Sequence, residues 1–309
     1  MHRVLAVAVN TFREAVRDRV LHGMIGIATF VLLFTLVLAE VALDQKLRIV
    51  LDVGLASISV FSVVVSIFLG SSLLYKEIER KTLYIILPKP IHRWEFLLGK
   101  YFGIVLTACV FIAIMGAVQL CVTSVQAGVS LTYVVAAGVG LPALLGVWMW
   151  KARDRTAVVV PWSLVAVGVA IAIASTGKVE LGPILAALTL SVGEVLVLTA
   201  VALFFSAFST PFLTALFCVG VWVVGRSADT MVTMKTRAIP GVVKHMLKHA
   251  VWYWPNFNLF VPGRHTLETQ LTQGAGPLSY VANALVYAVC YSAVVLTLAA
   301  IIFRRRDFV

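Results

Sequence analysis

The chain has 309 residues, of which 61% are hydrophobic and only 13% are charged, with a formal net charge of +11. Soluble domains usually carry about 25% charged residues, so a lipid bilayer rather than water must solvate most of this surface. The positive charges lie in short clusters between long apolar runs, as loop charges do in membrane proteins, and this placement excludes nucleic acid as the partner.

Residues 3–20 have the pattern of an amphipathic helix. Leu5, Ala8 and Phe12 repeat at helical spacing, while arginines and acidic residues share another face. Such a helix lies along a membrane interface, where its arginines reach lipid headgroups or a partner. We therefore assign residues 1–20 to a cytoplasmic interface helix, with a plain topology anchor as the alternative.

A transmembrane helix needs about 20 consecutive apolar residues, because it crosses about 30 Å of hydrocarbon at 1.5 Å per residue. Measured against this length, the charge-free intervals of the chain predict an all-α bundle with about eight crossings. One crossing lies within residues 20–39, one within 53–75, two within 101–150, one within 156–177, two within 181–225 and one within 279–303.

The two longest intervals each contain a turn signal. Residues 124–128 are polar and contain a glycine, and Ser209-Thr210-Pro211 divides the later interval. Eight crossings return both chain ends to one side of the membrane. Because Lys and Arg in short loops favour the cytoplasm, we expect both termini and the loop 76–100 there, in the cytoplasmic (inner) membrane of a bacterium.

The loop 76–100 contains six basic and three acidic residues around a short apolar stretch. Pro88 and Pro90 must end any helix there, since each lacks an N–H and restricts the residue before it. The pattern predicts a short helix, a stiff extended elbow and a new helix near Trp94. Both signs of charge on such an elbow favour docking against a soluble protein, and a solvated linker is the alternative.

The segment 226–278 resembles neither a membrane span nor a disordered linker. Pro240 can open a helix over residues 241–254, with apolar residues on one side and Lys and His on the other. We expect one or two helices that dip into the outer leaflet, forming an extracytoplasmic amphipathic hairpin. Residues 279–309 then supply the last transmembrane helix and a basic cytoplasmic tail.

Glu194 is the only acidic residue in the middle of the apolar run 181–206. An ionisable group at membrane depth costs at least about 2.5 kcal/mol, so we expect its side chain to face the bundle interior. Two interpretations are open: a proton or substrate site on a translocation path, or a hydrogen-bonded structural carboxylate.

His245 and His249 are spaced i, i+4, which places both imidazoles on one helix face as metal ligands require. No Glu follows His245, so the H-E-x-x-H protease pattern is not present. Interfacial histidines beside lysines are commoner than a metal site. We therefore predict no metal and keep the pair only as candidate ligands.

No G-x-x-x-x-G-K-[ST] phosphate loop occurs in the sequence. The chain therefore has no means of hydrolysing ATP by the usual phosphate-loop chemistry, and an ATP-driven role needs a second polypeptide. No Ser/His/Asp or paired-carboxylate constellation emerges either, so no catalytic residue is predicted and the chain is not expected to be an enzyme.

The stretch from Gly54 to Gly103 resembles the ABC type-2 permeases, and the closest subfamily is the one named for multicopper-enzyme maturation. The strings that carry the resemblance are "KEIERKT" (76–82), "LPKP" (87–90), "RWEFLLGKY" (93–101), "FREAVRDRVL" (12–21), "FFSAFSTPFLTAL" (204–216) and "WPNFNLFVP" (254–262). The family is similar in having six spans with an extracytoplasmic hairpin before the last one. Residues 131–177 depart from that pattern and look like an inserted span pair within the bundle 21–225.

The resemblance implies the permease subunit of an ATP-driven exporter. It would pair with a second permease copy, as a homodimer or with a related permease, and with two copies of an ABC ATPase. ATP and Mg²⁺ would bind to those ATPase subunits, and no cofactor to this chain. The loop 76–100 would be the coupling element, with Lys76, Glu77, Glu79, Arg80, Leu83, Leu87, Pro88, Pro90 and Arg93 as the candidate coupling residues.

Two other classes of function compete with this reading. One is a membrane-embedded secondary transporter or enzyme that uses Glu194 and the outer histidines. A secondary transporter should show several polar groups at the midplane, and here there is a single acid. The other is a structural membrane anchor for a larger complex.

Overall fold

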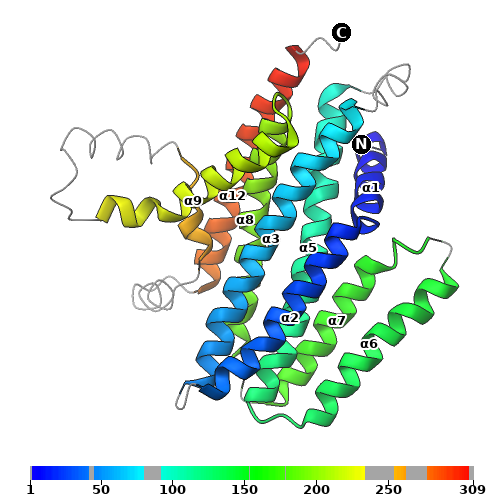
Figure 1. Ribbon diagram of the computed structural model, residues 1–309, viewed down its shortest axis with the longest axis vertical. Helices are drawn as coiled ribbons and strands as arrows, with labels where there is room; N and C mark the ends of the chain where they lie inside the picture. The colour runs from blue at the N-terminus through cyan, green and yellow to red at the C-terminus, as the bar shows by residue number, and fades with distance from the viewer. Residues whose placement is uncertain are drawn as a thin grey trace.

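The computed structural model of the protein describes residues 2–41, 45–79, 92–152, 154–177, 179–233, 254–261 and 277–305. Over these ranges it is all-helical, as expected (Figure 1). Its elements are α1 (His2–Val16), α2 (Arg19–Val41), α3 (Lys46–Glu79), α5 (Arg93–Gln126), α6 (Leu131–Lys151), α7 (Val159–Ser175), α8 (Leu181–Ser206), α9 (Pro211–Thr233), the 3₁₀ turn η1 (Phe257–Phe260) and α12 (Pro277–Arg305).

Six helices within the described ranges are long and apolar enough to cross a membrane, namely α2, α3, α5, α6, α8 and α12. The chain is therefore an integral membrane protein. Two further apolar helices, α7 with 17 residues and α9 with 23, occupy the positions of the other two predicted crossings. At 1.5 Å per residue α7 measures about 25 Å, less than the hydrocarbon core of about 30 Å.

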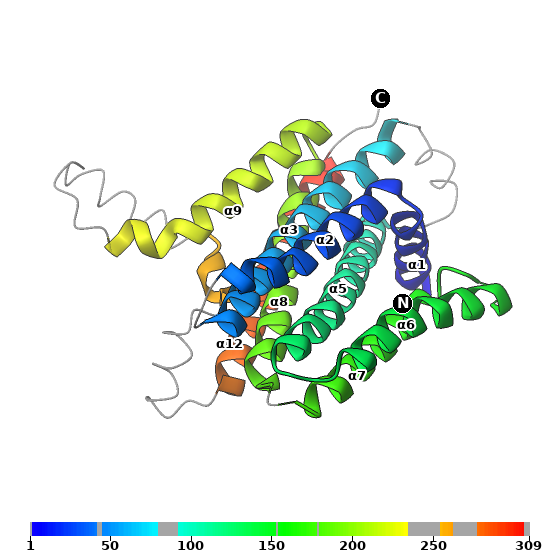
Figure 2. The same cartoon turned by 60° about the horizontal axis from the view of Figure 1, so that its bottom comes forward.

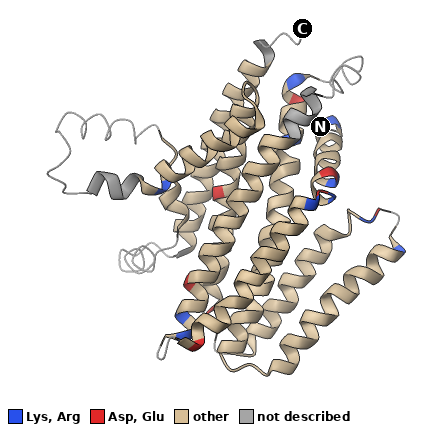
Figure 3. Cartoon of the chain, in the orientation of Figure 1, with Lys and Arg blue, Asp and Glu red and all other residues tan. Residues whose placement is uncertain are grey.

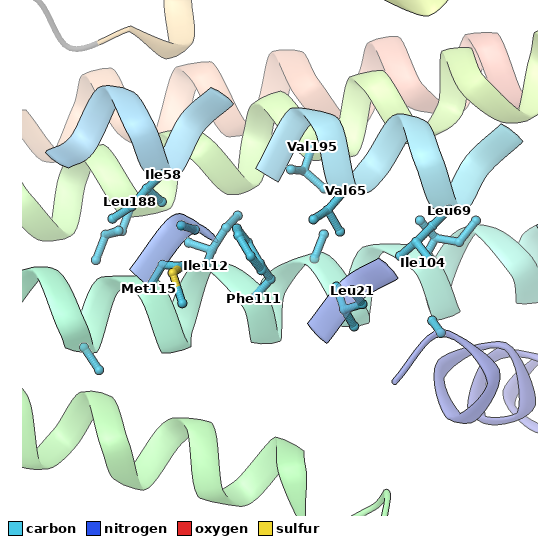
Figure 4. Close-up of a cluster of buried hydrophobic side chains, with 14 of the residues drawn as sticks. Leu21, Ile58, Val65, Leu69, Ile104, Phe111, Ile112, Met115, Leu188 and Val195 are labelled. Atoms are coloured by element: carbon cyan, nitrogen blue, oxygen red, sulfur yellow. The ribbon is translucent and has the colours of Figure 1, made fainter. Parts of the chain in front are cut away.

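The centre of the bundle is formed by α3, α5 and α8, which pack against one another. Around them, α1, α2 and α7 pack against α5, while α12 packs against α8. Figure 4 shows Ile58 and Val65 of α3 meeting Phe111 and Ile112 of α5 and Val195 of α8. Figure 2 shows that α6 and α9 lie at opposite edges of this bundle.

Several hydroxyl side chains inside the helices bond to the backbone of their own helix. The hydroxyls of Ser62, Ser66, Thr107, Thr123 and Ser191 each donate to a carbonyl three or four residues earlier. A buried polar group without a partner is costly, and this local bond satisfies it without a second helix. Hydroxyls can therefore sit in the core without fixing how the helices pack.

The predicted turns agree with the structure. The helix α5 ends at Gln126, and Gly128 follows with a positive φ of +84°, which a glycine adopts without strain. The Ser209-Thr210-Pro211 turn separates α8 from α9. The new helix expected near Trp94 begins one residue earlier, at Arg93. The short helix expected at the start of the loop 76–100 is the last part of α3, and the elbow at residues 80–91 lies outside the described residues.

The start of α5, the end of α12 and the helix α1 lie in one half of the bundle, called here the α1 end (Figure 1). The α1–α2 junction lies about halfway along α5, with Arg17 near Thr107. The α2–α3, α5–α6 and α7–α8 connections lie at the opposite end. Figure 3 shows charged residues at both ends of the bundle and also beside its middle, at the α1–α2 junction and the α6–α7 connection. Between these connections and the opposite end the helices carry few charges, which a hydrocarbon layer around them requires.

Two glycines of α5 let α1 approach closely. A Cβ on Gly99 would lie 2.5 Å from Val7 Cβ, and one on Gly103 would lie 2.6 Å from the carbonyl oxygen of Ala8 and from Thr11 Cβ. The spacing Gly-x-x-x-Gly is typical of close helix packing in membranes. The helix α1 therefore packs closely against α5, and its placement at a cytoplasmic interface stays a prediction.

Replacing Gly103 with Leu should push α1 away from α5. Because a leucine cannot fit beside the α1 backbone, we expect a loss of about 1–3 kcal/mol of stability, measured as a lower thermal unfolding temperature in detergent. Gly168→Leu in α7 is the matched control, since nothing lies within 4 Å of a Cβ there. Equal unfolding temperatures for the two variants would show that the α1–α5 contact adds nothing to stability.

Candidate functional site

The most unusual group in the bundle is the carboxylate of Glu194, which has 0% of its surface exposed. Glu194 lies near the middle of α8, which spans Leu181–Ser206. At 1.5 Å per residue it is about 20 Å from either end of that helix. The expectation that this side chain faces the bundle interior rather than lipid is confirmed.

Donors from two other helices converge on the Glu194 carboxylate. Ser59 Oγ of α3 donates to Oε2 at 2.6 Å. From α9, Trp222 Nε1 donates to Oε1 at 2.7 Å and Arg226 Nη1 donates to the same oxygen at 2.9 Å. An ion pair reinforced by two neutral donors therefore joins α3, α8 and α9 in the interior of the bundle.

Contacts other than the one with Glu194 also fix the position of the Arg226 guanidinium on α9. Trp222 and Arg226 are four residues apart, so they share one face of the helix. The Arg226 guanidinium lies 5.2 Å from the centre of the Trp222 ring, and its Nη1 also donates to Ser59 Oγ at 3.2 Å. The ring and the hydroxyl fix the orientation of the guanidinium, whose side chain keeps 24% of its surface exposed.

Glycines beside the two charged residues let η1 pack onto the site. A Cβ on Gly193 would lie 2.7 Å from the ring of Phe260, and one on Gly225 would clash with the carbonyl oxygen of Pro255. Phe257 and Phe260 are buried, with 0% and 2% of their surfaces exposed. An apolar cover therefore lies beside the ion pair, where it limits the access of water to the charges.

Hydrogen bonds hold η1 in this place. Tyr287 Oη of α12 accepts from the backbone N–H of Asn256 at 3.0 Å, and Tyr280 Oη donates to the carbonyl of Leu259 at 2.7 Å. Trp254 Nε1 donates to the carbonyl of Val221 in α9 at 3.0 Å. The segment 254–261 thus connects α9 to α12 beside Glu194.

Arg226 is the functional residue that the sequence reading missed. A charge-free interval ends just before Arg226, which places this residue at the start of the predicted extracytoplasmic segment 226–278. In the structure it belongs to α9 and contacts the middle of α8. The usable signal was Trp222 four residues earlier, which places a second donor on the same helix face as the arginine.

The other predicted site residues are not brought to Glu194. Lys76, Glu77 and Glu79 belong to the last part of α3. Arg93 begins α5 and its Nη1 donates to the carbonyl of Phe303 in α12 at 3.2 Å. The candidate coupling residues Arg80, Leu83, Leu87, Pro88 and Pro90 and the candidate metal ligands His245 and His249 lie outside the described residues.

The site is an ion pair in which the hydrogen-bonding capacity of the carboxylate is used by protein donors. Both carboxylate oxygens have donors. No group of three or more His, Cys, Asp or Glu residues occurs within the described ranges, so the acid there has no companions with which to form a metal site. The arrangement favours the structural interpretation of Glu194, in which the carboxylate holds three helices together.

No protein-family model matches the chain, and no match was found among curated proteins. The likeness to ABC type-2 permeases is therefore a resemblance carried by the quoted strings alone. The class that the fold defines is an integral membrane protein with an all-helical bundle.

Removing Glu194 alone should be more damaging than removing the pair. Glu194→Leu leaves the Arg226 guanidinium in the bundle without its acid, and breaking a buried pair in this way costs about 3–5 kcal/mol. In the double variant Glu194→Leu/Arg226→Leu no charge remains, so we expect most of that loss to be recovered.

The measurement is a double-mutant cycle on thermal unfolding temperatures in detergent. Ser59→Ala is the control for losing one neutral donor to a charge, and it should cost about 1.5–3 kcal/mol. Arg226→Leu completes the cycle. If the losses of Glu194→Leu and Arg226→Leu simply add in the double variant, the two charges are not coupled and do not form a structural pair.

Proposed function

We propose that the protein is the permease subunit of an ATP-driven ABC type-2 exporter. It forms a translocation pathway with a second permease copy and is driven by two separate ATPase subunits, which hold ATP and Mg²⁺. The proposal includes about eight crossings, counting α7 and α9, and a bacterial cytoplasmic membrane with both termini in the cytoplasm. Its sequence support is the resemblance of residues 54–103 together with the lack of a phosphate loop.

The observation that best supports the proposal is the length of α3 and α5, the two helices on either side of the predicted coupling loop. Each helix has 34 residues, which is about 51 Å at 1.5 Å per residue, against about 30 Å of hydrocarbon. The charge-free part of α3 ends at Tyr75, so Lys76–Glu79 extend beyond it. Residues 80–91 join two helices that are long enough to leave the membrane and reach a soluble partner.

The α5 side of the loop is fixed to the rest of the α1 end. Arg93 bonds to the Phe303 carbonyl, and the rings of Phe96 and Phe303 stack with their centres 6.5 Å apart. Further along α5, Gly99 and Gly103 receive α1. A displacement applied at the loop would therefore pass to α12 and α1 as well as along α5, as coupling requires.

The charge distribution supports an orientation with the α1 end in the cytoplasm. Among the described residues, the Lys and Arg side chains at this end are Arg3, Arg13, Arg17, Arg19, Arg93, Lys100, Lys151 and Arg155. At the opposite end, Lys46 pairs with Glu40 at 2.6 Å and Arg48 pairs with Asp52 at 3.5 Å. Basic residues favour the cytoplasmic side, where an ATPase would be available.

Reversing two charges next to the loop should weaken ATPase binding. If the groove on the ATPase is basic, the double change Glu77→Lys/Glu79→Lys replaces attraction by like-charge repulsion. We expect at least a tenfold loss of co-purified ATPase, identified by mass spectrometry after affinity purification from cells. Leu83→Asp should also reduce it, by placing a charge at an apolar contact.

The matched control is Glu180→Lys, which reverses an exposed acid at the opposite end of the bundle. It should leave co-purification unchanged, and size-exclusion profiles in detergent should be the same for all variants. The proposal fails if no ATPase accompanies the unaltered protein. It also fails as a docking model if neither the charge reversal nor Leu83→Asp changes the amount bound.

A further inference from the structure

The helix α6 is nearly detached from the bundle. Only Ala137 of its residues is buried, and it packs mainly against α7, with a few contacts to α5. Figures 1 and 2 both show α6 at the edge of the molecule. The separation leaves a space bounded by α2, α5, α6 and α7.

This space is a groove made of two hollows in series. The hollow toward the α1 end has a volume of about 590 Å³, and the hollow toward the opposite end has a volume of about 510 Å³. Ile114 and Trp162 line both. Trp162 Nε1 donates to the Leu141 carbonyl of α6 at 2.9 Å, which ties α7 to α6 where the hollows meet.

The lining changes character along the groove. The hollow toward the opposite end is walled by apolar residues, with Thr29 as its one hydroxyl, and that hydroxyl donates to the carbonyl of Ile25. The hollow at the α1 end is lined mostly by apolar residues, but Arg17, His22 and Arg155 are also among its lining residues. One end of the groove therefore suits hydrocarbon and the other suits an anion.

The two arginines are available to a ligand. Arg17 and Arg155 are exposed, and their guanidinium groups have no hydrogen-bond or ion-pair partner in the part of the chain that the structure describes. The neighbouring acid Asp154 is already paired with Arg13 at 2.9 Å. Asp18 accepts from the backbone N–H of Val20, and His22 contacts the Asp18 carbonyl.

We propose that this groove binds an anionic glycerophospholipid. The lipid phosphate lies between Arg17 and Arg155, and the acyl chains follow α5 past Trp162 toward Gly138. Guanidinium groups bind phosphate oxygens through paired N–H donors, and basic pockets between transmembrane helices are typical sites for anionic headgroups. A lipid also suits the sequence of surfaces in the groove, a cationic end followed by an apolar channel, and a second copy of the chain is the alternative occupant.

The experiment is native mass spectrometry of the delipidated full-length protein, titrated in detergent with phosphatidylglycerol or phosphatidylcholine. The unaltered protein should bind its first phosphatidylglycerol more tightly than its first phosphatidylcholine. In Arg17→Ala/Arg155→Ala this preference should be lost, with phosphatidylglycerol affinity falling about tenfold for each arginine. Arg17→Lys/Arg155→Lys keeps the charge and should retain part of the preference.

The matched control is Arg19→Ala/Lys151→Ala. It removes the same charge from exposed side chains at the same end of the bundle, but neither residue lines the groove. It should bind phosphatidylglycerol as the unaltered protein does. A second variant, Gly138→Phe, fills the other hollow, where nothing lies within 4 Å of a Cβ, and should weaken both lipids equally.

Three results would overturn the proposal. The first is an unaltered protein with no preference for phosphatidylglycerol. The second is an equal loss in Arg17→Ala/Arg155→Ala and in Arg19→Ala/Lys151→Ala, which would mean that overall charge rather than a site attracts the lipid. The third is a lipid-free dimer whose formation displaces bound lipid, which would show that a second copy covers the groove.

Discussion

The carboxylate of Glu194 and the guanidinium of Arg226 meet in the interior of a bundle that offers few other charges. Either charge alone at that depth is expensive, while the pair with two added donors is tolerable. The cost of separating them falls on α9, which contacts the bundle through α3, α8 and η1. The pair therefore positions α9, and with it the turn η1 that packs between α9, α8 and α12.

The sequence predicts the positions of most helices, because each crossing of the bilayer needs a charge-free interval of about 20 residues. The interior position of Glu194 was readable for the same reason. Its partner was not, because a rule that ends each span at the first charge assigns Arg226 to the next segment. Likewise, the spacing of Gly99 and Gly103 predicts that another helix packs closely against them. The spacing does not say that this helix is α1.

Two separate sets of contacts hold the helices of the bundle together. At the α1 end, α5 is joined to α1 by close packing and to α12 by the Arg93 and Phe96 contacts with Phe303. In the interior, the ion pair joins α3 and α8 to α9. Because α3 and α5 also flank the predicted coupling loop, a displacement of that loop would reach both sets of contacts. The groove beneath α6 lies outside both, so its lipid can be tested without disturbing them.

The most direct test of the ion pair as the anchor of α9 is hydrogen–deuterium exchange of the protein in lipid nanodiscs, comparing it with Glu194→Gln. The substitution keeps the size of the side chain and removes its charge. We predict faster exchange within residues 211–233 and 254–261 of the variant, with α2 and α5 unchanged, since their contacts do not involve Glu194. Equal exchange of 211–233 in both proteins would contradict the account, because α9 would then be held by something other than the pair.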